Sequence, residues 1–241
     1  EIGTFTTISE DGCNEASLTA TITIINVPIV ITPDPEPTVT ITNGICKCPD
    51  ATVGDEVTIA GTAYKVVDNS TIVSQLSNGN YNLCTTFVTN MDELFQNKSS
   101  FNSDISFWDV SNVTTMVDLF QSAQSFNQDI SGWDVSNVTS MENTFKYARN
   151  FNQDISGWDV SSVINMSAMF FEDSNFNQDI GNWDTSSVTN MYATFRNADT
   201  FNQDLTGWCV TNISSEPSDF TTSRSALTDA NKPIWGTCPG G

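Results

Sequence analysis

The sequence predicts an α/β repeat solenoid in which every turn of 25 residues contributes one short strand and one short helix. The first observation is a repeated phrase, because "FNQDISGWDVSNVTSM" at 126–141 returns as "FNQDISGWDVSSVINM" at 151–166. Variants of it begin at 101, 176 and 201, always 25 residues apart. A fixed period of this length indicates stacked repeats. The second observation is that each copy carries apolar residues that one turn alone cannot bury, so each turn completes the core of its neighbour.

Residues 1–37 have a different pattern. "SLTATITIINVPIVI" at 17–31 alternates apolar and polar residues, and we interpret it as the closing strands of an immunoglobulin-like β-domain whose earlier part lies upstream. "TPDPEP" at 32–37 then reads as a semi-rigid linker. The alternative is that residues 1–31 add strands to the next unit. On the first interpretation the chain is an excised part of a longer secreted protein.

Residues 38–86 predict an N-terminal cap for the stack. "TVTIT" is typical of a strand, and "EVTIAGTAYKVV" indicates a β-hairpin that turns at Ala60 and Gly61. "DNSTIVSQLSNG" predicts a short helix with Asp68, Asn69 or Ser70 at its N-cap and with Gly79 just past its end.

Residues 87–208 hold the regular repeats, numbered here from Phe101 as position one. In the central copy the repeated apolar residues are Phe151, Ile155, Trp158, Val163, Met166 and Phe170. Met at position sixteen and Phe at position twenty lie four apart, which predicts one face of a two-turn helix. The residue before each Met (Thr115, Asn165 or Asn190) is a natural N-cap. Positions three to ten then hold the strand, centred on residues such as Ile130 or Val135, and the tryptophan column belongs to the core.

Residues 209–241 predict a C-terminal cap. The fifth copy has Cys209 at position nine, the Met column lapses to Glu216, and Pro217 disfavours helix at the residue before it. Leu227, Ile234 and Trp235 are available to cover the open end.

Six cysteines outside the regular part of the repeats indicate disulfides and an oxidising compartment. Cys209 and Cys238 bracket the last segment and are predicted to be bonded to each other. The other four cysteines allow three pairings. The prediction is Cys48–Cys84 within the N-terminal cap, which leaves Cys13–Cys46 across the linker.

Composition excludes several classes of function. A net charge of -21 repels nucleic acid and anionic lipid, and no apolar run reaches the roughly 20 residues that a membrane span needs. The chain has no histidine, the usual general base. Carboxylates that are copied in every turn are unlike the unique constellation of an active site. We therefore predict a protein that is not an enzyme and needs no cofactor.

Two carboxylate columns are the candidate metal site. Position four holds Asp104, Asp129, Asp154, Asp179 and Asp204, and position nine holds Asp109, Asp134, Asp159 and Asp184. Stacked like charges repel, so something must compensate them. One reading is calcium bound between turns. The preferred reading is that each Asp accepts backbone amides in an Asx-turn. Position two is a column of asparagines, whose side chains are expected to form a hydrogen-bonded ladder.

The motif "FNQDIS.WDVS.VT.M...F..A" resembles the BspA-like, leucine-rich-repeat-related repeats of bacterial surface proteins and lipoproteins. The resemblance covers roughly residues 45 to 238, including the flanking caps. It implies a leucine-rich-repeat-like fold, exposure at the bacterial cell surface or secretion, and adhesion to a host or matrix.

Two functions fit these observations. One is an adhesin-like module that binds a protein or a glycan; the other is a structural stalk or fibre segment, made with neighbouring copies and without a ligand. Residues that differ between turns separate the two, because binding predicts that they gather in one patch. The residues in question are Lys146, Arg149, Glu172 and Arg196.

Overall fold

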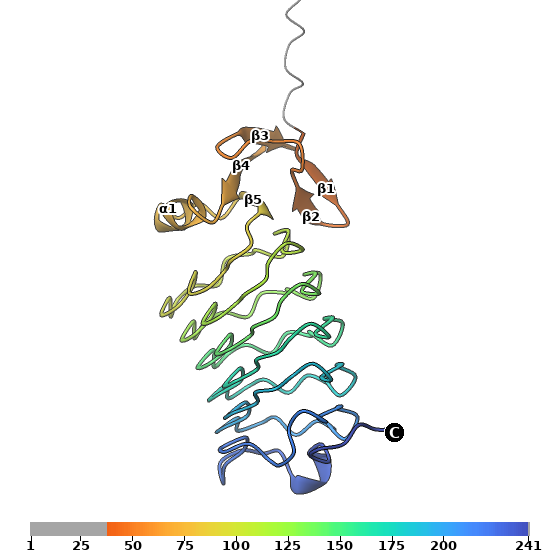
Figure 1. The fold of residues 1–241 in the computed structure, drawn as a ribbon. Coiled ribbons are helices and arrows are strands. Elements are labelled where there is room, and N and C mark those ends of the chain that lie inside the picture. The colour runs from red at the N-terminus through yellow and green to blue at the C-terminus, as the bar shows by residue number, and fades with distance from the viewer. Residues whose placement is uncertain (1–37, 241) are drawn as a thin grey trace, which may run out of the picture. The chain divides into compact units, whose positions relative to one another are not determined.

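The structure, a computed structural model, describes residues 38–240 (Figure 1). These residues belong to one compact unit. The immunoglobulin-like strands and the linker predicted at residues 1–37 lie outside the described residues, as does Cys13.

The N-terminal cap is built from two small sheets. Strands β1 (Thr40–Thr42) and β2 (Ile45–Lys47) form an antiparallel hairpin. Strands β3 (Glu56–Ile59) and β4 (Thr62–Asp68) form a second hairpin, to which β5 (Leu83–Phe87) adds in parallel. The second hairpin turns at Ala60 and Gly61, both with positive φ (49° and 86°) as a two-residue type I′ turn requires. The predicted turn is confirmed.

Helix α1 (Ile72–Ser77) crosses from β4 to the parallel strand β5. Asp68 Oδ1 accepts the N–H groups of Ser70 and Thr71, each at 3.0 Å, which holds the chain at the start of the helix. Gly79 has φ 73° just past the end, and its N–H donates to the carbonyl of Leu76. The short helix predicted here is confirmed.

Below β5 the 25-residue turns lie one above another (Figure 1). Isolated parallel bridges join one residue of each turn to its equivalent in the next, and these residues are Asn90, Thr115, Ser140, Asn165 and Asn190. Beyond each bridge, alternate N–H groups donate to carbonyls of the next turn. In the middle of the stack Asn143 donates to Ser167 at 2.9 Å and Phe145 to Met169 at 3.0 Å.

The predicted α/β solenoid of leucine-rich-repeat type, with a strand and a helix in every turn, is wrong. Within the described residues the only helical segments are α1 and the 3₁₀ turn η1 (Asp229–Asn231), and both lie outside the repeats. The residue predicted as a helix N-cap is the bridge residue. Positions three to ten form no strand, because their donors are used locally, as when the Trp158 N–H bonds to the Ile155 carbonyl at 3.1 Å.

The supposed helix is instead a series of tight turns. The Thr144 N–H bonds back to Met141, and the Lys146 N–H to Asn143. Positions eighteen and twenty-two have left-handed φ in every regular turn, for example 54° at Asn143 and 51° at Ala168. An α-helix directs its N–H groups to its own residues four back. A two-turn helix is marginal by itself, whereas here every second N–H finds a partner in the next turn.

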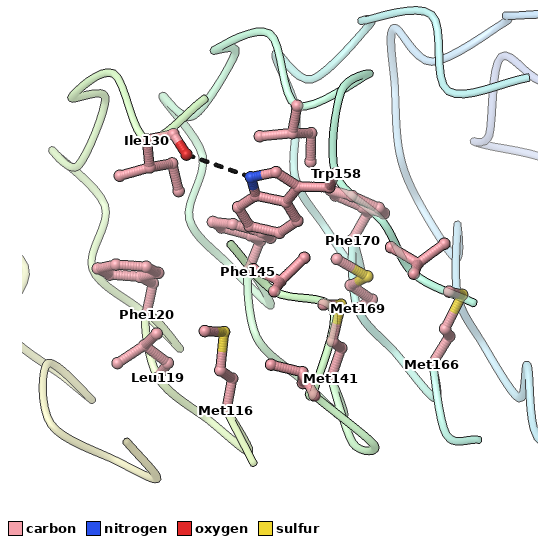
Figure 2. Close-up of a cluster of buried hydrophobic side chains, with 14 of the residues drawn as sticks. Met116, Leu119, Phe120, Ile130, Met141, Phe145, Trp158, Met166, Met169 and Phe170 are labelled. Atoms are coloured by element: carbon pink, nitrogen blue, oxygen red, sulfur yellow. Dashed lines mark hydrogen bonds between the residues drawn. The ribbon is translucent and has the colours of Figure 1, made fainter. Parts of the chain in front are cut away.

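Aromatic side chains fill the stack (Figure 2). Position-twenty rings stack along the axis, with Phe145 and Phe170 centroids 5.7 Å apart. Position-one rings form a second column, with Phe151 and Phe176 centroids 6.0 Å apart. Within a turn the two columns touch, with Phe145 and Phe151 at 4.1 Å. Trp158 is 4% exposed and its Nε1 donates to the Ile130 carbonyl of the previous turn at 3.2 Å, so the prediction that tryptophan is core is confirmed.

The C-terminal segment ends the aromatic stack. Phe220 meets Phe195 edge-on at an interplanar angle of 86°, and Trp235 meets Phe220 at 85°. Leu227 is buried as expected, but Ile234 is 69% exposed, so its predicted place over the open end is wrong. Past Pro217 the ladder continues with a one-residue shift, because the Phe195 N–H bonds to the carbonyl of Phe220.

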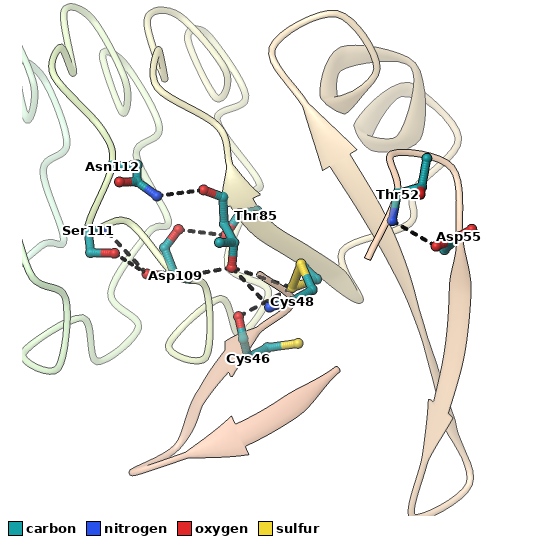
Figure 3. The surroundings of a disulfide bond; sticks show 10 residues. Cys46, Cys48, Thr52, Asp55, Thr85, Asp109, Ser111 and Asn112 are labelled. Carbon is teal, nitrogen blue, oxygen red and sulfur yellow. Dashed lines mark hydrogen bonds between the residues drawn. A yellow bond between two sulfur atoms is a disulfide. The ribbon is translucent and has the colours of Figure 1, made fainter. Parts of the chain in front are cut away.

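Two disulfides fix the caps. They join Cys48 to Cys84 and Cys209 to Cys238, which are the pairs that the spacing predicts. Figure 3 shows the first of them beside the junction of β5 and the first turn, where the Thr85 hydroxyl donates to the Asp109 carbonyl at 2.9 Å. Cys46 forms no disulfide within residues 38–240.

Candidate functional site

The carboxylate columns are used by the backbone. At position four, Asp154 Oδ1 accepts the N–H of Ser156 at 2.9 Å, and at position nine Asp159 Oδ1 accepts that of Ser161 at 3.0 Å. Equivalent bonds occur at Asp104, Asp129, Asp179, Asp204, Asp109, Asp134 and Asp184. These are the Asx-turns of the preferred reading. In the described part of the chain no group of three or more Cys, Asp or Glu side chains is placed to hold a metal ion.

Hydrogen bonds to these carboxylates also favour their charged form. The side-chain and backbone bonds from Ser161 lower the pKa of Asp159, and those from Ser156 lower the pKa of Asp154. Stacked negative charges are therefore tolerated without a counter-ion in the site.

The asparagine column forms a ladder of a different kind from the one expected. Asn127 Oδ1 accepts the backbone N–H of Asn152 at 2.9 Å, and Asn152 Oδ1 accepts that of Asn177 at 3.0 Å. The side chain thus bonds to the backbone of the next turn rather than to its side-chain neighbour. This column is part of the scaffold.

Residues that differ between turns gather on one face of the third to fifth turns. We call this surface the variable patch, and its members are Lys146, Tyr147, Arg149, Phe171, Glu172 and Arg196. Phe171 is half-buried at its centre. Lys146 Nζ lies 5.3 Å from the Phe171 ring centroid on one side, and Arg196 Cζ lies 5.4 Å from it on the other. The Tyr147 ring meets Phe171 edge-on at 5.3 Å.

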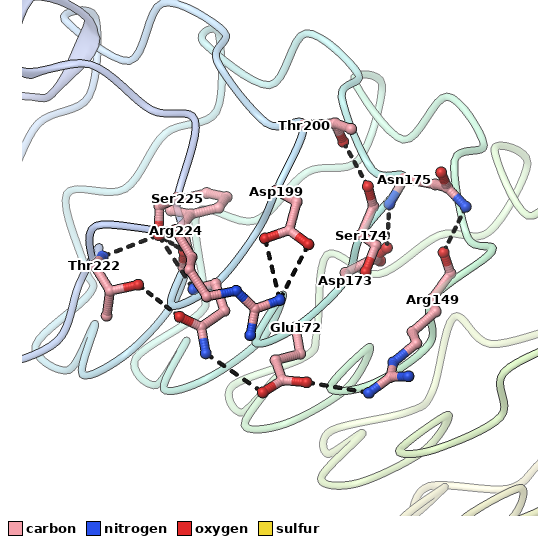
Figure 4. Close-up of polar contacts among 12 residues, drawn as sticks. Arg149, Glu172, Asp173, Ser174, Asn175, Asp199, Thr200, Thr222, Arg224 and Ser225 are labelled. Atoms are coloured by element: carbon pink, nitrogen blue, oxygen red, sulfur yellow. Dashed lines mark hydrogen bonds and ion pairs between the residues drawn. The ribbon is translucent and has the colours of Figure 1, made fainter.

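Ion pairs tie the patch across turns. Arg149 contacts Glu172 at 3.1 Å (Figure 4), and Arg196 contacts Asp219 at 2.6 Å. These pairs are exposed, so they orient the side chains more than they stabilise the fold. Lys146 is in no ion pair within residues 38–240, which leaves its ammonium available to a ligand. The four residues chosen from the sequence as a test of clustering therefore do cluster.

Sequence reasoning missed two aromatic members, Tyr147 and Phe171. The signal was present, because position twenty-one is Gln96 and Gln121 in the first two turns before it changes to Lys146, Phe171 and Arg196. The columns that stay constant build the scaffold. The column that changes marks the surface that is free to specialise.

Asp173 is a second departure from the repeat, at the edge of the variable patch (Figure 4). It replaces the alanine found at Ala148 and Ala198 and is fully buried. Its Oδ1 accepts the N–H groups of Asn175 and Phe176, each at 3.3 Å, and its Oδ2 has no hydrogen-bond partner among the described residues. Burial raises the pKa of this carboxyl well above its usual value.

A cleft of about 630 Å³ lies between α1 and the first turn. Its apolar lining consists of Val73, Leu76, Tyr81, Leu94, Phe95 and Phe101. Its polar lining consists of Ser77, Asp92, Glu93, Gln96, Lys98, Ser100, Asn102 and Ser103. Since the variable patch lies on the third to fifth turns, the two surfaces are separate.

Comparison with known proteins gives a family. A family model described as "Mycoplasma protein of unknown function, DUF285" matches residues 66–170 and again residues 131–233. Together the two matches span more than half of the chain. The chain belongs to the DUF285 family. The overlap of the two matches agrees with the internal repeats of this DUF285 chain. No curated protein and no solved structure matches it.

Proposed function

We propose that this chain is a non-catalytic binding module that recognises a protein ligand through the variable patch. One observation carries the proposal: Lys146, Arg149, Glu172 and Arg196, which differ between turns, meet around the single ring of Phe171. Aromatic residues and arginine are the side chains that dominate protein–protein hot spots. A half-buried ring between two cations offers such an anchor, and the paired charges around it supply orientation.

The setting that we propose is extracellular or at a bacterial cell surface, with an adhesin-like role. Support comes from the two disulfides, which persist in oxidising compartments, and from the acidic, polar composition. The resemblance of the repeats to BspA-like surface proteins points the same way. Within the described residues no helix is long and apolar enough to cross a membrane.

Substitution by the repeat's own residue tests the proposal. Lys146→Gln, Phe171→Gln and Arg196→Gln together give the fourth column the glutamine that the first two turns already use, so the fold is retained. The full chain is applied to an array of extracellular matrix proteins and glycans. We expect binding to at least one protein, and at least about tenfold weaker binding by the triple variant, the size of one lost hot-spot contact.

Ile164→Thr is the matched control. Ile164 is 49% exposed and also departs from its column, which is threonine at Thr139 and Thr189, but it is not a member of the patch. It should leave binding unchanged. Equal loss in the control and the triple variant, or a ligand found only among the glycans, would count against a protein-binding patch.

A stiff spacer is the second candidate function. The uninterrupted phenylalanine stacks and the ladder of N–H donors between turns favour it, because every turn is tied to the next by the same contacts. A spacer needs no ligand. Absence of any binding to the array, with the triple variant as stable as the parent chain, would support the spacer instead.

A further inference from the structure

The first turn of the stack has a row of backbone acceptors without donors. In every later turn the carbonyls at positions seventeen, nineteen and twenty-one accept N–H groups from the preceding turn. In the second turn, for example, Val117 accepts from Glu93 at 2.9 Å and Leu119 accepts from Phe95 at 3.0 Å. The equivalent carbonyls of the first turn belong to Asp92, Leu94 and Gln96. Within residues 38–240 no hydrogen bond reaches them.

The reason lies in what precedes the first turn. The chain before it forms β5 and α1 rather than another turn, so the ladder of N–H donors begins only with the first turn itself. Asp92, Leu94 and Gln96 all line the cleft, and Leu76 of α1 lines its opposite side. Figure 1 shows α1 above this edge of the stack. The unpaired carbonyls therefore belong to a cleft that the protein has formed over them.

The other end of the stack is treated differently. There the exposed edge would consist of N–H donors, and the C-terminal cap supplies acceptors for them. The Phe195 N–H bonds to the Phe220 carbonyl at 2.9 Å, and the Asn197 N–H bonds to the Ser225 hydroxyl at 3.1 Å. One end is thus closed by the chain itself, while the carbonyl edge at the other end is left for a partner.

The chemistry of the cleft selects the partner. Besides the three carbonyls it presents the carboxylates of Asp92 and Glu93, against the single ammonium of Lys98. Gln96 Nε2 already donates to Gln121 at 2.9 Å, which leaves its Oε1 as a further acceptor. The wall opposite is apolar, and Val73 is 57% exposed on it. The cleft therefore fits a group that donates hydrogen bonds without accepting them and that comes with apolar neighbours.

A guanidinium meets this requirement, because it has five N–H donors and no acceptor. A peptide strand would bring its own carbonyls against the edge, and a sugar would leave Val73 and Leu76 without an apolar partner. We propose that the cleft between α1 and the first turn docks an arginine-bearing segment of a partner protein. The guanidinium donates to the carbonyls of Asp92, Leu94 and Gln96, and an adjacent apolar side chain packs on Val73 and Leu76. The net charge of -21 steers such a basic segment towards the molecule.

A short capped peptide of alternating leucine and arginine is the probe, titrated into the full chain labelled with ¹³C and ¹⁵N. We expect the carbonyl ¹³C resonances of Asp92, Leu94 and Gln96 to shift, while the already paired carbonyls of Val117 and Leu119 do not. The same peptide with citrulline for arginine keeps the shape and loses the charge. It should bind at least about tenfold more weakly, because hydrogen bonds from charged donors are the strong ones.

Two variants on one helix complete the test. Val73→Arg places a guanidinium in the cleft from within the chain and should abolish peptide binding. Ser74→Arg adds the same charge to the same helix outside the cleft lining and should leave binding unchanged. Equal affinity for the arginine and citrulline peptides, or unmoved resonances of the three carbonyls at millimolar peptide, would overturn the proposal. So would shifts of these carbonyls that follow protein concentration alone, since a second copy would then fill the cleft.

Discussion

Single residues in the repeat columns have roles that adjacent turns complete. Trp158 contacts a core made by its neighbours, and its indole N–H satisfies a carbonyl 28 residues earlier in the chain. The same bond joins Trp133 to Ile105 and Trp183 to Ile155. A tryptophan column that satisfies backbone carbonyls in the core is not a sugar platform.

Trp158→Ala should lower the free energy of unfolding by roughly 3–5 kcal/mol, as large-to-small changes in a well-packed core do. Chemical denaturation of the variant and of the parent chain measures the difference. A loss below about 1 kcal/mol would mean that the indole contributes no more than a surface side chain.

Asp173 is expected to destabilise the fold at neutral pH. Its pKa is raised in the folded state by burial, so the folded chain binds the proton more tightly than the unfolded chain does. Stability from this group is fully present below the unfolded pKa, near 3.8, and is lost as pH rises through the folded value. Asp173→Ala restores the residue of the neighbouring turns and should raise the free energy of unfolding at pH 7 by about 1–3 kcal/mol, the usual cost of an unpaired buried group.

The pH profile gives the control for that change. The gain from Asp173→Ala should shrink as pH falls towards 4, where the carboxyl is protonated. A gain that stays the same at both pH values would show that packing, rather than the buried charge, is responsible.

At the scale of elements, sequence reasoning succeeded where the signal was local. The Ala60-Gly61 turn, helix α1 and the Asx-turns at the aspartate columns all follow from a few adjacent residues. It failed for the segment from Met166 to Phe170, where spacing by four fits a helix and a series of tight turns equally well. What decides between them is a hydrogen-bond partner about 24 residues away, which no local pattern reveals.

Glycine substitution separates these two backbones. Ala168 has φ 51°, and Ala198 is a buried alanine of the next turn with no positive φ. Ala168→Gly should be neutral or stabilising, because a left-handed conformation costs alanine about 1 kcal/mol and costs glycine nothing. Ala198→Gly should destabilise the fold by roughly 0.5–1 kcal/mol. Thermal and chemical denaturation of both variants provides the comparison, and a similar loss from both would favour the helix.

At the scale of the whole molecule, the period predicted that turns stack and the cysteine spacing matched the disulfides at both ends. Neither could reveal that the ladder is polar, with donors facing one end and acceptors facing the other. That polarity follows from the left-handed residues at Asn143 and Tyr147, which no residue type enforces. It leaves one end with carbonyls to satisfy and the other with N–H groups, which is why the two caps differ. The variable patch was predictable as a set of residues, but its centre at Phe171 was not.

The account rests on backbone hydrogen bonds that run from each turn to the next. Scalar couplings across hydrogen bonds, measured by NMR on the deuterated full chain, detect these donor and acceptor pairs directly. We expect the amide nitrogen of Phe145 to couple to the carbonyl carbon of Met169, its acceptor at 3.0 Å. Coupling from Phe145 to the carbonyl of Met141, the acceptor four residues back that an α-helix would use, would contradict the account.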